Sequence, residues 1–213
     1  MNIIYFVAAG VIGYVMGAVP FGFLFVRLVK GIDLRQVGSG RTGGTNSMRA
    51  AGFGVGLITF LSDVLKGAAA VWLTRWLLSS QFAADLLPWA EVLAGATAVI
   101  GHNWSVFLKF KGGAGTGPNV GWATVVWWPI LPINILIGGL VLRFQGMASV
   151  ASLTVAGVIV VFFLGRYWWA GSSLAYPIGG VVTAVIVAWA LRPNIKRIVK
   201  GEERVVGPRA RRD

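Results

Sequence analysis

Two glycine-rich basic segments contain the residue types best suited to binding an anion. The first is VGSGRTGGTNSMRAAG at residues 37–52, and the second is FKGGAGTG at residues 110–117. Glycines let successive backbone N–H groups turn toward one anion, and Arg49 can grip a phosphate with two parallel hydrogen bonds. A helix that begins near Thr45 would add the positive end of its dipole. With Lys111 in the second segment, the pattern is typical of a site for more than one phosphate.

The first segment alone leaves another interpretation open. It lacks the Gly-Lys-Ser/Thr ending of a Walker A loop, and no strand precedes it as in a dinucleotide-binding fingerprint. A flexible connector whose arginines follow the positive-inside rule would have the same composition. The choice depends on whether both basic segments lie on one face of the protein.

Other polar side chains occur in or near apolar stretches. Asp63 and Lys66 lie one helical turn apart inside such a stretch, where charges are costly and pair. We therefore predict an ion pair that fixes helix packing and contacts the site. The single histidine, His102, is predicted to be interfacial and to bond a backbone carbonyl. With one histidine, no cysteine and seven acidic residues, no metal site is expected.

The composition defines the elements that must position these groups. Hydrophobic residues make up 56% of the 213-residue chain and charged residues 12%, and the mean hydropathy is +0.76. This predicts an integral membrane protein. The net charge of +12 fits basic residues gathered at the cytoplasmic side better than nucleic-acid binding. The N-terminus has no basic region of a signal peptide and is interpreted as a retained span.

Apolar stretches and charge together predict an all-α fold with about seven transmembrane helices. Five spans are clear, at residues 3–25, 53–78, 86–106, 150–164 and 174–191. Residues 116–142 form either one span or two short ones, and Pro129 and Pro132 favour a break. Two short helices place most basic residues inside, with the N-terminus outside and the C-terminus inside. Residues 1–205 would form one membrane domain, and residues 206–213 a basic tail.

This topology brings the polar segments to one face. Besides the two glycine-rich segments, that face would carry RPNIKRIVKGEE at residues 192–203 and RFQGMAS at residues 143–149. The third segment contributes Asn194 and Glu203, and the fourth contributes Ser149. Loops that share a face can converge on one site, which favours the phosphate-binding interpretation of the first segment.

At this point the motifs resemble those of a known family, the bacterial acyl-phosphate:glycerol-3-phosphate acyltransferases, or PlsY family. GSGRTGGTNSMRAAG is similar to GSGNxGATNxxR, and SDVLKG to DxxKG. GHNWSVFLKFKGGAGTG resembles GHxFxxFxxFKGGKG, and NIKRIVKGEE resembles NIxRLxxGxE. The four matches occur in the family's order and cover nearly the whole chain, which makes the resemblance specific.

The resemblance implies a seven-helix enzyme of the bacterial inner membrane with a cytoplasmic active face. It would move a fatty acyl group from acyl-phosphate to the 1-hydroxyl of glycerol 3-phosphate, giving lysophosphatidate and phosphate. No cofactor or metal is implied. Its partners would be these two substrates, membrane lipids and, functionally, a soluble phosphate acyltransferase that makes acyl-phosphate.

The family's site residues carry over by position. Catalytic roles fall on four residues: Ser39, Arg49, Asn194 and Glu203. Substrate phosphates would be held by residues of the two glycine-rich segments and their histidine: Gly38, Gly40, Gly43, Gly44, Thr45, Asn46, His102, Lys111, Gly112, Gly113 and Gly115. Supporting roles fall on Arg41, Asp63, Lys66 and Ser149.

Several positions depart from the family pattern. Arg41 replaces an asparagine, Ala114 replaces a lysine, and Leu191 replaces a histidine. Arg41 is therefore predicted to supply the lost charge from another place. The missing lysine and histidine also leave open a second interpretation, in which the protein is a catalytically degenerate paralogue that binds acyl-phosphate or phospholipid. A small transporter is a third interpretation, disfavoured because the polar groups lie at one face and not at mid-membrane.

Overall fold

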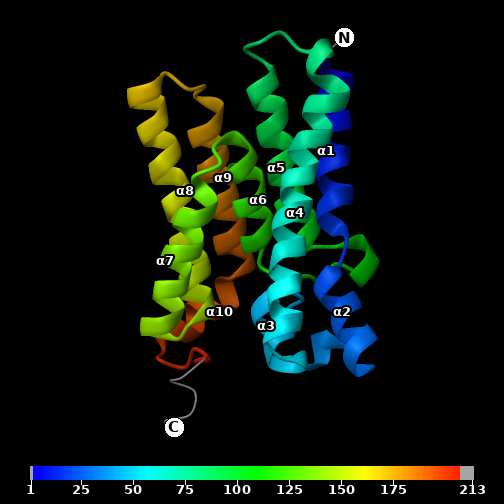
Figure 1. The fold of residues 1–213 in the computed structure, drawn as a ribbon, viewed down its shortest axis with the longest axis vertical. Helices are drawn as coiled ribbons and strands as arrows, with labels where there is room; N and C mark the ends of the chain where they lie inside the picture. Colours follow the sequence, from blue (N-terminus) through cyan, green and yellow to red (C-terminus); the bar gives the residue numbers. More distant parts are fainter. Residues whose placement is uncertain (1, 207–213) are drawn as a thin grey trace.

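The computed structural model describes residues 2–206 as a bundle of helices (Figure 1). The helices are α1 (Asn2–Ala18), α2 (Phe21–Lys30), α3 (Gly44–Ala51), α4 (Phe53–Leu78), α5 (Leu87–Asn103), α6 (Thr116–Val126), α7 (Ile130–Gln145), α8 (Ala148–Ala170), α9 (Ala175–Ala190) and α10 (Arg192–Val199). Short 3-10 turns at Leu34–Gln36, Ser79–Gln81 and Val106–Leu108 interrupt the connections. Residues 207–213, most of the predicted basic tail, lie outside the described residues.

The bundle has two groups of helices joined by α6. Helix α5 packs on α1 and α4, while α8 packs on α7 and α9. Helix α6 contacts members of both groups, and its Trp122 stacks beside Phe163 of α8 with ring centroids 5.3 Å apart. A side chain at Gly121 would overlap the backbone of Val64, so this glycine lets α6 lie directly against α4.

Within residues 2–206, three helices are long and apolar enough to cross a bilayer: residues 3–30 taken together, Phe53–Gln81 and Ala148–Ala170. The bent pair α9 and α10, at 68°, would make a fourth, and α7 is apolar but shorter. The integral membrane class is therefore confirmed, and the number of seven spans stays a prediction.

The break predicted between residues 116 and 142 is confirmed, because α6 ends at Val126 and α7 begins at Ile130. The first span, predicted over residues 3–25, is found as one candidate span over residues 3–30, and it contains a break that was not predicted. Helix α1 ends at Ala18 and α2 starts at Phe21, since Pro20 has no N–H to donate and pushes its predecessor out of helical geometry. The predicted span at residues 150–164 was too short, because α8 continues to Ala170 through Arg166.

A buried polar cluster ties α4, α5 and α9 together at the end of the bundle where α1 begins. Arg75 donates through Nε and Nη2 to Glu91, at 2.5 and 3.0 Å, and Tyr176 donates to the same carboxylate at 2.9 Å. The opposite end holds α2, α3 and α10 (Figure 1). The polar segments singled out in the sequence meet at that second end.

Candidate active site

A cavity of about 450 Å³ lies among α3, α4, α6, α7, α8 and α10. Its wall changes character from one end to the other. Polar and charged side chains line the end near α3 and α10: Ser39, Arg41, Thr45, Arg49, Ser149, Asn194, Glu203 and Arg204. Apolar side chains of the long helices line most of the rest: Leu57, Phe60, Val120, Ile135, Leu142 and Val155. One cavity therefore offers a charged end and an apolar flank.

Asn46 holds the first glycine-rich loop in shape. Its buried amide Nδ2 donates to the carbonyls of Leu34, Val37 and Arg41, and its Oδ1 accepts the backbone N–H of Ser39 at 3.1 Å. Gly38 has φ +56°, and a side chain there would overlap Asn46 Oδ1. The loop therefore requires glycine and asparagine at these places to present its other residues to the cavity.

Arginines give the polar end its positive charge. Arg49 extends from the last turn of α3, and no hydrogen bond or ion pair reaches its guanidinium from residues 2–206. Burial and the nearby charge of Arg204 lower the pKa of Arg49 from its ordinary value. Arg204 lines the same end. Arg49 and Arg204 are thus two cations held close together, and Arg49 has no hydrogen-bond or ion-pair partner within residues 2–206. Such a pair is suited to binding a phosphate.

Glu203 organises the wall opposite Arg49. Its carboxylate accepts from Asn194 Nδ2 at 2.7 Å, from the Ser149 hydroxyl at 2.9 Å and from Arg197 Nε at 3.0 Å. Burial raises the pKa of Glu203, but these three hydrogen bonds outweigh it and hold the pKa below its usual value. The carboxylate therefore fixes Asn194 and links α8 to α10.

Arg41 crosses the site and joins three segments. Its Nη1 donates to the Gly113 carbonyl at 2.8 Å, and its Nη2 donates to the Ala190 carbonyl and, at 3.2 Å, to Asn194 Oδ1. Burial and the nearby charge of Arg197 lower the pKa of Arg41. The guanidinium thus lies between Gly113 and Ala190, the residues directly before Ala114 and Leu191. At those two positions the family pattern has lysine and histidine.

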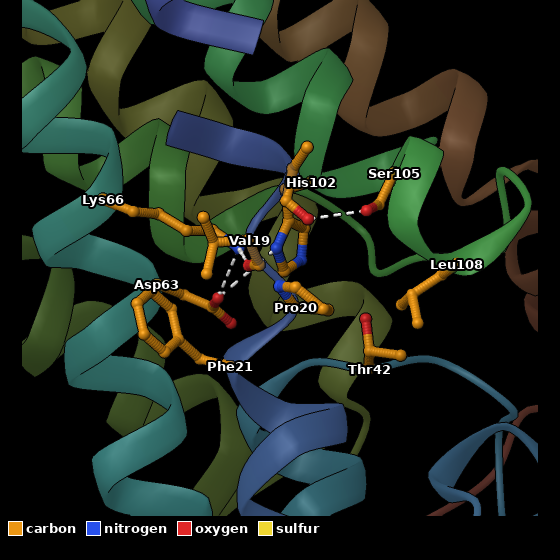
Figure 2. A pocket seen from close by; sticks show the side chains of 10 residues that line it. Val19, Pro20, Phe21, Thr42, Asp63, Lys66, His102, Ser105 and Leu108 are labelled. Atoms are coloured by element: carbon orange, nitrogen blue, oxygen red, sulfur yellow. Dashed lines mark hydrogen bonds and ion pairs between the residues drawn. The ribbon is translucent and has the colours of Figure 1, made fainter. Parts of the chain in front are cut away.

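The predicted ion pair of α4 is confirmed, and its Asp63 lines the cavity. Lys66 Nζ is 2.8 Å from Asp63 Oδ1 and donates to the Val19 carbonyl, which also accepts the N–H of Phe21 (Figure 2). His102 Nδ1 lies 3.4 Å from the same Asp63 oxygen. His102 is 5% exposed, so the prediction of an interfacial histidine bonded to a backbone carbonyl is wrong. The α5–α4 packing buries its ring against Asp63.

The structure brings most of the predicted residues to the cavity wall. Those that line it are Ser39, Arg41, Gly43, Gly44, Thr45, Asn46, Arg49, Asp63, His102, Gly115, Ser149, Asn194 and Glu203. Those that do not are Gly38, Gly40, Lys66, Lys111, Gly112 and Gly113. The side chain of Lys111 is exposed beyond the wall, because Lys109 and Phe110 both adopt left-handed backbone conformations just before it.

Sequence reasoning missed three features of the cavity. Arg204 directly follows the Glu203 that ends the third motif, and this position beside the motif was the available signal. The hydroxyls of Thr116 and Ser152 pair at 2.7 Å on the wall, and Asn134 lines the apolar part. These three lie on apolar helices, where the spacing of residues does not reveal a cavity.

The fold and the site define a helical membrane protein whose cavity joins a cationic pocket to an apolar wall, an arrangement suited to a phosphorylated lipid substrate. The family model "Glycerol-3-phosphate acyltransferase" matches residues 7–201. The chain belongs to the glycerol-3-phosphate acyltransferase family.

Relatives and solved structures agree with this assignment. The chain is 38% identical to the glycerol-3-phosphate acyltransferase of Synechococcus sp. (strain CC9902), over 94% of both chains. It is 34% identical to that of Gloeobacter violaceus, over 91% of both chains. It is similar to crystal structures of PlsY (YgiH), an integral membrane glycerol 3-phosphate acyltransferase. The glycerol 3-phosphate form has a TM-score of 0.81 at 29% identity, covering 95% of this chain and 96% of that one. The lysophosphatidic acid form has 0.80 at 27% identity, covering 95% of each.

Proposed function

We propose that the protein transfers a fatty acyl group from acyl-phosphate to the 1-hydroxyl of glycerol 3-phosphate. The observation that carries the proposal is the Arg49 guanidinium, which lies beside Arg204, has no hydrogen-bond or ion-pair partner within residues 2–206 and lies at the charged end of a cavity whose flank is apolar. Both substrates carry a phosphate and one carries an acyl tail. The cavity has a place for each kind of group.

The reaction is a substitution at the acyl carbon. The 1-hydroxyl oxygen attacks the carbonyl carbon and forms a C–O bond, and the bond from that carbon to the phosphate oxygen breaks. Phosphate leaves with the electron pair and accepts the proton that the hydroxyl loses, so the products are the ester and inorganic phosphate. Since acyl-phosphate is already activated, positioning and charge stabilisation can supply most of the rate.

The residues at the charged end divide into contacts and supports. Arg49, with Arg204 beside it, binds substrate phosphate, and the Ser39 and Thr45 hydroxyls orient the reacting groups. Asn194, fixed by Glu203, contacts the glycerol moiety. Asn46 keeps its predicted place beside the substrates, but its amide bonds the loop itself, so we assign it a positioning role.

The apolar flank takes the acyl tail. Leu57 of α4 and Ile135 of α7 line the cavity and are 45% and 50% exposed, so the cavity opens between these helices toward the surface that lipid would cover. An acyl chain entering from the bilayer keeps its methylenes out of water throughout.

We further propose seven spans, with the charged end at the cytoplasmic face of the bacterial inner membrane. Helices α5, α6, α7 and α9 are shorter than a bilayer-spanning helix and would tilt little or thin the bilayer locally. Arg27, Arg49, Arg143 and Arg197 all belong to the end that holds α2, α3 and α10, in keeping with the positive-inside rule. A soluble phosphate acyltransferase on that side would supply the acyl donor.

Phosphate release from acyl-phosphate tests the proposal. Purified protein in lipid nanodiscs should release phosphate only when glycerol 3-phosphate is present, and lysophosphatidate should form in equal amount. Arg49→Ala should reduce the rate at least ~1,000-fold, because it removes a charge-assisted bidentate contact in a low-dielectric site. Arg143→Ala is the matched control, since this exposed arginine of α7 does not line the cavity.

Two results would contradict the proposal. Wild-type protein that binds acyl-phosphate without turnover would identify a degenerate paralogue, the alternative that Ala114 and Leu191 raise. Full turnover by Arg49→Ala would remove the role assigned to the guanidinium.

A further inference from the structure

The loop between α5 and α6 exposes three large apolar side chains that the candidate active site does not use. Val106, Phe107 and Phe110 are 50%, 61% and 59% exposed. Phe107 and Phe110 belong to the motif GHNWSVFLKFKGGAGTG, but none of the three residues lines the cavity. Large apolar side chains gathered at one exposed place mark a surface that another molecule covers.

The fold holds this loop firmly in its outward-facing arrangement. The Ser105 hydroxyl donates to the last carbonyl of α1 at 2.6 Å, and the Ser105 carbonyl accepts the N–H of Phe110 at 2.8 Å. In the middle of the loop, Leu108 is 3% exposed and its carbonyl accepts from Arg35 Nη1 at 3.4 Å. Lys109 and Phe110 both have left-handed backbones, which cost energy for non-glycine residues and persist only where the surroundings fix them. The exposure of the apolar side chains is therefore built into the structure.

The position of the loop along the bundle indicates that lipid covers it. Figure 1 shows the green loop after α5 at the side of the bundle, at the level where α1 ends, while α2 and α3 extend further toward the charged end. Helix α1 has 17 residues and is therefore about 25 Å long, compared with about 30 Å for the hydrocarbon core of a bilayer. In the orientation proposed above, the loop lies at the inner edge of that core. A soluble protein would meet the ends of α2 and α3 before it reached this level.

Two lysines accompany the apolar side chains of the loop. Lys109 and Lys111 are exposed, and no hydrogen bond or ion pair reaches either ammonium from the part of the chain that the structure describes. Helix α2 shows the same mixture, with Leu28 and Val29 exposed beside Lys30. Apolar side chains with lysines beside them are typical of a surface that lies in the interface of a leaflet with anionic lipids.

We propose that this loop anchors the protein in the cytoplasmic leaflet. Val106, Phe107 and Phe110 insert among the acyl chains, and Lys109 and Lys111 bind the phosphates of anionic lipids. The inference goes beyond the proposed function and shares with it only the orientation of the charged end. It assigns Lys111 to the phosphate of a lipid headgroup, in place of the substrate phosphate that the sequence predicted for it.

Site-directed spin labels test the insertion. The chain has no cysteine, so a single introduced cysteine carries the only label. In lipid nanodiscs, labels at Phe107→Cys and Phe110→Cys should collide more with oxygen, which dissolves in lipid, than with a water-soluble nickel complex. Val161→Cys, on the exposed face of α8, gives the lipid reference, and Glu202→Cys, exposed after α10, gives the water reference. Loop labels as open to the nickel complex as the label at Glu202 would overturn the insertion and leave this surface to a soluble protein.

Quenching by brominated lipids tests the role of the two lysines. A fluorophore on Val106→Cys is followed in phosphatidylcholine nanodiscs that contain the same minor fraction of either brominated phosphatidylglycerol or brominated phosphatidylcholine. Each lysine near an anionic leaflet enriches anionic lipid about fivefold, so brominated phosphatidylglycerol should quench several-fold more strongly, and Lys109→Gln with Lys111→Gln should remove most of the difference. Lys196→Gln with Lys200→Gln, an exposed pair at α10, is the matched control and should keep the difference.

Two quenching results would overturn the role of the lysines. One is equal quenching by the two lipids when both loop lysines are present, and the other is an equal loss in the control pair. Neither experiment measures acyl transfer, so a protein without turnover that gives the expected collisions and quenching would overturn only the proposed function.

Discussion

Replacing Arg41 by alanine tests how this chain functions without the lysine and histidine that the family pattern has at Ala114 and Leu191. The Arg41 guanidinium donates to the carbonyls of Gly113 and Ala190, each one residue before a changed position, and to Asn194 Oδ1. It is therefore both a nearby positive charge and a brace for the loops that bear the site.

The structure sets the size of the effect. A hydrogen bond from a charged group contributes about 1.5–3 kcal/mol, and Arg41→Ala removes three of them. Part of the loss is offset because water reaches the half-buried carbonyls. If about 3 kcal/mol is lost from the transition state, kcat/KM falls roughly 100-fold. Since all three hydrogen bonds of the Arg41 guanidinium go to the protein and one of them fixes Asn194, kcat should fall more than KM rises.

Steady-state phosphate release in nanodiscs, with both substrates varied, measures this split. Arg41→Lys keeps the charge but cannot reach three acceptors with a planar fork, so it should recover less than a tenth of the lost activity. Adding Ala114→Lys to Arg41→Ala should recover activity if charge is the missing element. Arg41→Ala with activity within twofold of wild type would refute the reasoning. Full activity of Arg41→Lys would refute the bracing role and leave only the charge.

Two further predictions concern the supports of the site. The folded-state pKa of Glu203 is lowered below its ordinary value of 4.5, so its stabilisation is present above about pH 4.5 and is lost as the pH falls through the lowered pKa. Limited proteolysis of wild type after residue 199 should therefore accelerate in acid. Glu203→Gln should be cleaved quickly at pH 7 as well. Equal cleavage rates for the two proteins at pH 7 would contradict this prediction. Asp63→Asn should lower the free energy of unfolding by about 3 kcal/mol, because it leaves Lys66 buried without its counter-charge. Thermal unfolding in detergent measures the loss. The control is Asp33→Asn, in a partly exposed pair with Arg35, which is expected to cost less than about 1 kcal/mol. Similar losses in both variants would show that burial of the Asp63–Lys66 pair contributes nothing.

Much of the fold could be predicted because the bilayer imposes strong rules on sequence. Long apolar stretches identified the helices, and Pro129 marked the break between α6 and α7 through its missing N–H. The same rule applied to Pro20 would have found the break between α1 and α2. The apolar residues on both sides of Pro20 read as one uninterrupted span and hid the break. Only the tertiary structure shows that Lys66, from another helix, donates to the Val19 carbonyl at the break.

The sequence by itself determined the class of protein, the family and the segments that form the site. Glycines and arginines in a fixed order carry that information, since phosphate binding requires those residue types. Only the tertiary structure decided which side chains face the cavity. Two left-handed non-glycine residues, Lys109 and Phe110, direct Lys111 away, and Asn46 bonds its own loop. Arg41 reaches carbonyls 72 and 149 positions away in the chain. These placements depend on loop geometry and on packing between distant helices, which no local pattern of residues encodes.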